Sequence, residues 1–130
     1  MRKMNTIVYP NESYRIIGAI LEVHNRLGIG LMEKVYQEAL EKEFIFQKIP
    51  YEREKKYELY YRGVKMDAYY ISDFVCYDKI IVEIKAVSEI LDVHRAQLRN
   101  YLSLAKCKLG ILANFNELFM NPQRIINSGV

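Results

Sequence analysis

The sequence has no tryptophan, and it has few prolines, glycines and cysteines: three, six and two among 130 residues. The two cysteines, Cys76 and Cys107, show neither CxxC nor Cys/His spacing, which argues against a zinc motif and against a disulfide scaffold. No apolar run approaches the ~20 residues of a membrane span, and residues 1–14 lack the apolar stretch of a secretory signal. We therefore expect a cytoplasmic protein that does not enter the membrane.

The composition is that of an ordinary globular chain, with 51% hydrophobic and 27% charged residues. At this length we expect a single domain spanning residues 1–130. The net charge is +3, and many of the basic residues lie in two stretches. The first holds Arg53, Lys55, Lys56, Arg62 and Lys65, and the second holds Arg95, Arg99, Lys106, Lys108 and Arg124. Basic stretches suit a nucleic-acid partner, although a solvated surface gives the same pattern.

Hydrophobic periodicity predicts two helices, a strand-rich region, a third helix and a last strand. Helices are expected at residues 12–26, 31–47 and 92–106, and strands at 51–61, 64–77, 80–87 and 109–115, with a short edge strand at 124–126. The strand at 80–87 is nearly all apolar, which is typical of a central strand. The final strand–helix–strand unit implies a parallel pair joined by a right-handed crossover. The predicted fold class is therefore α/β, with helices packed against a mixed sheet.

Three charged residues, Asp73, Glu83 and Lys85, stand within the second and third predicted strands. If residues 77–79 form the loop of a hairpin, Asp73 lies directly opposite Glu83, about 5 Å away at Cβ. Side chains alternate along a strand, so Lys85 shares the face of Glu83. Because an unpaired buried charge is costly, two carboxylates and an amine on an apolar surface indicate a metal site or a catalytic site.

This set of groups suits the hydrolysis of a phosphodiester. Asp73 and Glu83 would bind Mg²⁺ or Mn²⁺, which prefer oxygen ligands, and the backbone carbonyl of Ile84 could add a ligand. The metal would activate a water and neutralise charge on the phosphate, while Lys85 would orient that water or stabilise the developing negative charge. The alternative is a salt bridge on the face of the sheet, because the spacing of these residues is a loose pattern.

The helix predicted at 92–106 carries two polar residues, Gln97 and Tyr101, inside its apolar arc. They are four positions apart and are therefore neighbours on one face. Polar groups on the side that faces the sheet need partners, and a site at the edge of the sheet would supply them. The alternative is a buried pair that bonds to the backbone.

The helix predicted at 31–47 offers three acids, Glu33, Glu38 and Glu43, any of which could be a third carboxylate of the metal site. Periodicity does not choose among them, because the approach of this helix to the sheet is unknown. Glu33 shares a side of the helix with Tyr36, which favours it slightly. Each alone also fits a surface acid.

Residues 30–36 read Gly-Leu-Met-Glu-Lys-Val-Tyr, which resembles the motif of the small bacterial and archaeal GxxExxY proteins. Residues 82–87 and 96–102 look like later blocks of the same family, and the likeness runs from about residue 12 to residue 126. That family is placed in the PD-(D/E)XK nuclease-like superfamily, whose restriction-endonuclease-like core has the order αβββαβ. The resemblance implies this core with an extra N-terminal helix, which agrees with the predicted order of elements.

The resemblance also implies residue roles. Asp73 would be the first acid and Glu83 with Lys85 the ExK pair, while Gln97 and Tyr101 look like the QxxxY element of exonuclease V-type nucleases. We therefore expect a metal-dependent nuclease that acts on nucleic acid, with DNA favoured, and that forms a homodimer to extend its reach. The alternatives are a nucleic-acid-binding or regulatory module without useful turnover, and an interaction protein whose acids merely satisfy each other.

Overall fold

A computed structural model describes residues 7–129 of the chain. The elements in chain order are α1 (Pro10–Leu27), α2 (Glu33–Gln47), β1 (Tyr51–Arg53), β2 (Lys56–Tyr61), β3 (Val64–Ile71), β4 (Phe74–Cys76), β5 (Ile80–Lys85), α3 (Asp92–Ala105), β6 (Leu109–Asn114) and β7 (Gln123–Ile126). Each predicted helix exists, with ends within two residues of the expected ones. Within the described residues, no helix combines the length and apolar character that crossing a membrane requires.

Five strands form one mixed sheet in the order β1-β4-β5-β6-β7. The β5–β6 pair is parallel, as the crossover through α3 predicts, and the other three pairs are antiparallel. Taken in sequence, α2, β1, β4, β5, α3 and β6 give the αβββαβ core. Helix α1 precedes this core and β7 adds an edge strand, so the predicted fold class is confirmed.

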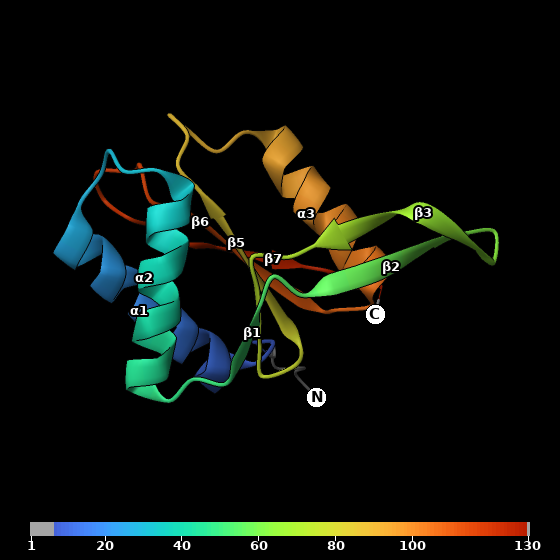
Figure 1. Ribbon diagram of the computed structural model, residues 1–130, viewed down its shortest axis with the longest axis horizontal. Coiled ribbons are helices and arrows are strands. Elements are labelled where there is room, and N and C mark those ends of the chain that lie inside the picture. Colours follow the sequence, from blue (N-terminus) through green and yellow to red (C-terminus); the bar gives the residue numbers. More distant parts are fainter. Residues whose placement is uncertain (1–6, 130) are drawn as a thin grey trace, which may run out of the picture.

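The buried residues form a cluster on each face of the sheet. Helices α1 and α2 cover one face, and α3 with the base of the β2–β3 hairpin covers the other (Figure 1). Because side chains alternate along β5, its even-numbered apolar residues point toward α1 and α2. Glu83 and Lys85 consequently face the side of α3.

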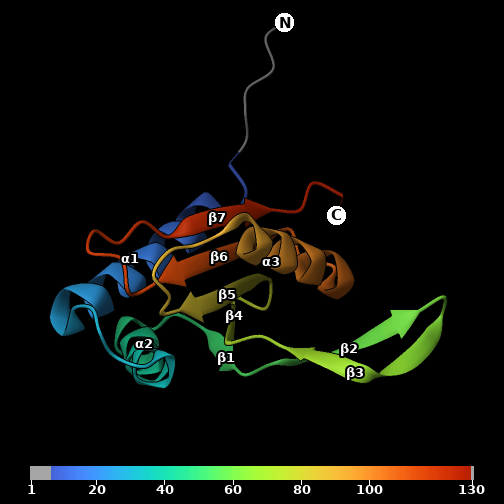
Figure 2. The same ribbon diagram turned by 90° about the horizontal axis from the view of Figure 1, so that it is seen from above.

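The two long strands predicted at 51–61 and 64–77 are each broken, which corrects the sequence prediction. Glu54 adopts a left-handed backbone angle, φ 57°, which ends β1. The two segments leave the main sheet between β1 and β2 and between β3 and β4. At this point the Ser72 N–H donates to the Lys55 carbonyl at 3.0 Å. Among the described residues, strands β2 and β3 pair only with each other, and they project from the body as a hairpin (Figures 1 and 2).

The predicted register between the second and third strands of the core is confirmed. Phe74 pairs with Val82 and Cys76 with Ile80, so residues 77–79 form the loop. Extending this pairing by one step brings Asp73, at the break between β3 and β4, beside Glu83. The predicted register is therefore present, although the predicted strand is broken next to Asp73.

Candidate active site

Asp73 and Glu83 are joined through backbone and side-chain hydrogen bonds. The Asp73 N–H donates to Glu83 Oε1 at 3.3 Å. In turn, the Ile84 N–H donates to Asp73 Oδ2 at 2.7 Å. Each carboxylate is thus held at one oxygen by a backbone N–H of the neighbouring strand segment. The two carboxyl groups also contact each other directly, and this side-chain contact with Glu83 lowers the pKa of Asp73, though less than burial raises it.

Burial dominates the electrostatics of this pair. It raises the pKa of Glu83, and the negative charge of Asp73 raises that pKa further. Burial also raises the pKa of Asp73, against the Ile84 hydrogen bond, which lowers it. The positive charge of Lys85 lowers the pKa of both acids, but less than burial raises them. Two acids held where their ionised forms are disfavoured suit a site that gains a cation.

Glu83 opens onto a pocket of about 290 Å³ between the sheet, α3 and the base of the hairpin. Four of the five residues predicted to be catalytic line it: Glu83, Lys85, Gln97 and Tyr101. Asp73 is half-buried and is not part of the lining, although its N–H reaches Glu83. The fold therefore brings together residues from β5 and α3 as the sequence predicted.

Lys85 is half-buried at the end of β5 and forms no ion pair with any residue between 7 and 129. Its register partner on β6 is Asn114, which is buried. The Asn114 amide holds the backbone of Val87 at both groups, accepting from its N–H at 3.0 Å and donating to its carbonyl at 2.9 Å. This clamp fixes the chain where it leaves β5, and so limits the movement of Lys85.

Gln97 and Tyr101 both line the pocket from α3. Within residues 7–129 their side chains form no hydrogen bond to the backbone, and neither residue is fully buried, so the alternative of a buried pair does not describe them. Gln97 is exposed. The ring of Tyr101 is half-buried and stacks on Tyr70, with centroids 3.9 Å apart and planes at 8°. Their polar groups are therefore available to a ligand in the pocket.

The three glutamates of α2 differ in their relation to the acids. Glu33 is exposed in the first turn, and its charge raises the pKa of Asp73, though less than burial does. Glu38 is exposed, and Glu43 accepts a hydrogen bond from Gln47 of its own helix at 2.7 Å. In the part of the chain that the structure describes, no three acid, histidine or cysteine side chains gather as a metal-binding group.

The donor set nevertheless fits Mg²⁺ or Mn²⁺. Magnesium is commonly held by one or two carboxylates and keeps several waters, so a third protein acid is not required. Asp73 Oδ1 and Glu83 Oε2 are hard oxygen donors, and their other oxygens are fixed by backbone N–H groups. A cation would also relieve the burial of the two charges.

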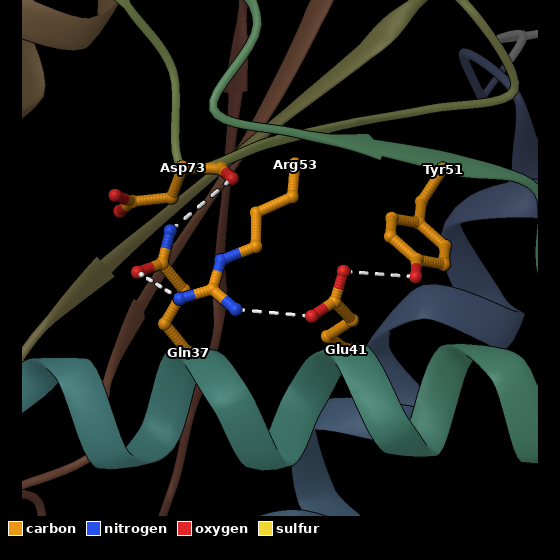
Figure 3. A network of polar contacts seen from close by, with 5 residues as sticks. All are labelled: Gln37, Glu41, Tyr51, Arg53 and Asp73. Atoms are coloured by element: carbon orange, nitrogen blue, oxygen red, sulfur yellow. Dashed lines mark hydrogen bonds and ion pairs between the residues drawn. The ribbon is translucent and has the colours of Figure 1, made fainter.

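A polar network supports Asp73 from the side of α2 (Figure 3). Its backbone carbonyl accepts from the Glu54 N–H at 2.9 Å and from Gln37 Nε2 at 3.5 Å. Gln37 Oε1 accepts from Arg53, whose guanidinium also pairs with Glu41 at 3.0 Å. Figure 3 shows the Asp73 carboxylate pointing away from this network. The network therefore holds the backbone of Asp73 and leaves its side chain available.

Tyr70 is a site residue that no sequence pattern predicted. It lines the pocket, and its hydroxyl donates to Glu83 Oε1. In one continuous strand, residues 70 and 73 would point to opposite faces. The break after Ile71 changes this alternation and lets both approach Glu83, and no local sequence pattern marks that break.

Comparison with known proteins identifies a family and a fold. A sequence model of the PD-(D/E)XK nuclease superfamily matches residues 10–126. No curated protein sequence matches the chain significantly. Among solved structures, the chain is similar to the "Crystal structure of SSO0001", with 20% sequence identity and a TM-score of 0.56. The match covers 91% of this chain but 57% of that one, so this chain spans little more than half the length of that protein.

Proposed function

The chain belongs to the PD-(D/E)XK nuclease superfamily, and from this premise we propose that it is a Mg²⁺- or Mn²⁺-dependent nuclease that hydrolyses phosphodiester bonds in DNA. Its assignment to the GxxExxY group within that superfamily, and a single nuclease-like domain over residues 1–130, are part of the proposal. The observation that carries it is the pocket on which Glu83, Lys85, Gln97 and Tyr101 converge next to Asp73.

The acids and the lysine of the site would have separate roles. Asp73 and Glu83 would hold the cation, with the Ile84 carbonyl as a further ligand. Glu33, whose charge acts on Asp73, would be the acid of α2 that joins through water. When bound, the cation supplies Lewis acidity toward the phosphate and lowers the pKa of a water. Lys85 would donate to the attacking water or to a phosphate oxygen as negative charge develops.

Gln97 and Tyr101 would bind and orient the phosphate backbone. An amide and a phenol can donate to phosphate oxygens, and contacts to the backbone fix the register of the substrate without reading its sequence. Both residues lie on one face of α3, whose position against β6 is fixed by packing. DNA is favoured over RNA on the family resemblance, and the assay below separates the two.

We also propose that the chain forms a homodimer. Leu118 and Phe119 are 70% and 86% exposed in the connection between β6 and β7. This connection meets the α1–α2 loop, where the Gly30 N–H donates to Asn116 at 3.3 Å. Large apolar side chains exposed side by side are candidates for an interface, and the molar mass in solution tests the proposal.

The nuclease proposal is tested by incubating the protein with supercoiled, linear and single-stranded DNA and with matched RNA. Each reaction is run with Mg²⁺, with Mn²⁺ and with chelator. We expect cleavage of DNA that requires the cation and falls at least about 100-fold in Glu83→Gln and Lys85→Ala, since each removes a group that acts on the reacting phosphate.

Lys42→Ala is the matched control, because Lys42 is an exposed lysine of α2. Cleavage that persists in chelator, or in both site variants, would contradict the proposal. Binding of nucleic acid without cleavage under every condition would favour a binding module instead.

A further inference from the structure

Tyr70 occupies an unusual position for a residue of a projecting hairpin. It lies near the end of β3 and is 7% exposed, between the hairpin and α3. Its ring is stacked on Tyr101 at 3.9 Å and on Tyr57 at 5.8 Å, with the planes at 8° and 21°. Stacking on two aromatic neighbours fixes the plane of the ring and therefore the place of its hydroxyl.

That hydroxyl is directed at one oxygen of Glu83. Tyr70 Oη donates to Glu83 Oε1, which also accepts from the Asp73 N–H at 3.3 Å. A phenolic hydroxyl is protonated near neutral pH and therefore serves as the donor in this bond. Oε1 thus has two fixed donors, the Tyr70 hydroxyl and the Asp73 N–H, and among residues 7–129 neither of these groups bonds to Oε2.

We propose that Tyr70 is a positioning residue, whose hydroxyl holds the Glu83 carboxylate so that Oε2 is presented to the cation and the substrate. The binding of a cation by Glu83 rests on the proposed function, whereas the hydrogen bond from Tyr70 to Glu83 does not depend on it. A consequence is that the hairpin forms part of the active site. Tyr70, at the base of the hairpin, orients Glu83 of β5, although the hairpin and β5 belong to different sheets.

A purely structural role for Tyr70 makes a different prediction. If the ring only packs the hairpin against α3, removing the hydroxyl changes nothing at Glu83. Tyr70→Phe separates the two roles, because it keeps both stacking contacts and removes only the donor. Tyr57→Phe is the matched control, since it belongs to the same stack while its hydroxyl contacts Cys107 instead.

The first measurement is hydrogen exchange of the Asp73 amide in the metal-free protein, followed by NMR. In Tyr70→Phe, Glu83 Oε1 loses one of its two donors and moves more freely, so we expect the Asp73 amide to exchange several-fold faster. Tyr57→Phe should leave this rate unchanged. An unchanged Asp73 rate in Tyr70→Phe would overturn the proposal, whether or not the protein cleaves DNA.

The second measurement is the affinity for Mn²⁺, by calorimetry. Loss of a group that orients a metal ligand typically weakens binding about 10- to 100-fold, and we expect this in Tyr70→Phe but not in Tyr57→Phe. Equal affinity of Tyr70→Phe and the unaltered protein would overturn the positioning role. If the unaltered protein binds no Mn²⁺, the proposed function fails, and the exchange rate of Asp73 still decides the role of Tyr70.

Discussion

At the scale of the residue, the central feature is a pair of acids held where ionisation is unfavourable. Glu83 accepts from Tyr70 and from the Asp73 N–H, yet burial and the charge of Asp73 still raise its pKa. A carboxyl whose pKa is raised by folding destabilises the fold once the pH is high enough to ionise it in the unfolded chain. The metal-free protein therefore carries a cost at neutral pH that a bound cation would relieve.

This cost predicts that Glu83→Gln stabilises the metal-free protein. An amide keeps an oxygen acceptor for Tyr70 and for the Asp73 N–H but carries no charge. We expect the free energy of unfolding at pH 8 to increase by about 1 to 3 kcal/mol, since a pKa change of one corresponds to about 1.4 kcal/mol. Denaturant unfolding with chelator present measures it, and Glu38→Gln, at an exposed acid of α2, is the control.

The sign of the pH dependence gives the same prediction a second check. Below the ordinary glutamate value of 4.5 the side chain is protonated in both states, so the stability advantage of the variant should be smallest there. As the pH rises above that value, the unfolded chain ionises first and the unaltered protein loses stability relative to the variant. An advantage of the variant that shrank with rising pH would contradict this account.

At the scale of the element, the position of α3 depends on a glycine of β6. Leu98, the buried residue of α3 next to Gln97, lies directly over Gly110. A Cβ added at Gly110 would be 3.0 Å from Leu98 Cδ2 and 3.1 Å from its Cγ. The absence of a side chain at Gly110 therefore lets the helix approach closely enough for Gln97 and Tyr101 to reach the pocket.

Gly110→Ala should push α3 outward and destabilise the fold by about 1 to 3 kcal/mol, the usual range for an overfilled core. Denaturant unfolding measures the loss. Gly18→Ala is the control, because nothing lies within 4 Å of its added Cβ and alanine favours a helix, so that variant should be as stable or more stable. Equal stability of Gly110→Ala and the unaltered protein would contradict the role of this contact.

The strands show which parts of the fold were predictable. The register that brings Asp73 beside Glu83 depends only on the loop at residues 77–79 and on alternation, both of which are local. The departure of the hairpin from the sheet is not local. It requires the backbone angle at Glu54 and the burial of Leu59 and Tyr70 against α3. Sequence periodicity therefore predicted the acids and their lysine but not the tyrosine that holds Glu83.

At the scale of the whole molecule, the site lies where three separate parts of the fold meet. The main sheet supplies Glu83 and Lys85, α3 supplies Gln97 and Tyr101, and the hairpin supplies Tyr70. The sequence predicted the first two parts because each stands on a strongly periodic element. It did not choose among the acids of α2, because the distance from that helix to Asp73 depends on tertiary packing.

The most direct test of the central claim is the location of Mn²⁺ in a crystal of the protein, by its anomalous scattering. Over the whole molecule, we expect the strongest peak between the carboxylates of Asp73 and Glu83, with oxygen ligands at about 2.0 to 2.6 Å, and we expect this peak to be absent in Glu83→Gln. A site that stays empty at a saturating concentration of Mn²⁺, or a strongest peak elsewhere that Glu83→Gln leaves unchanged, would contradict the account.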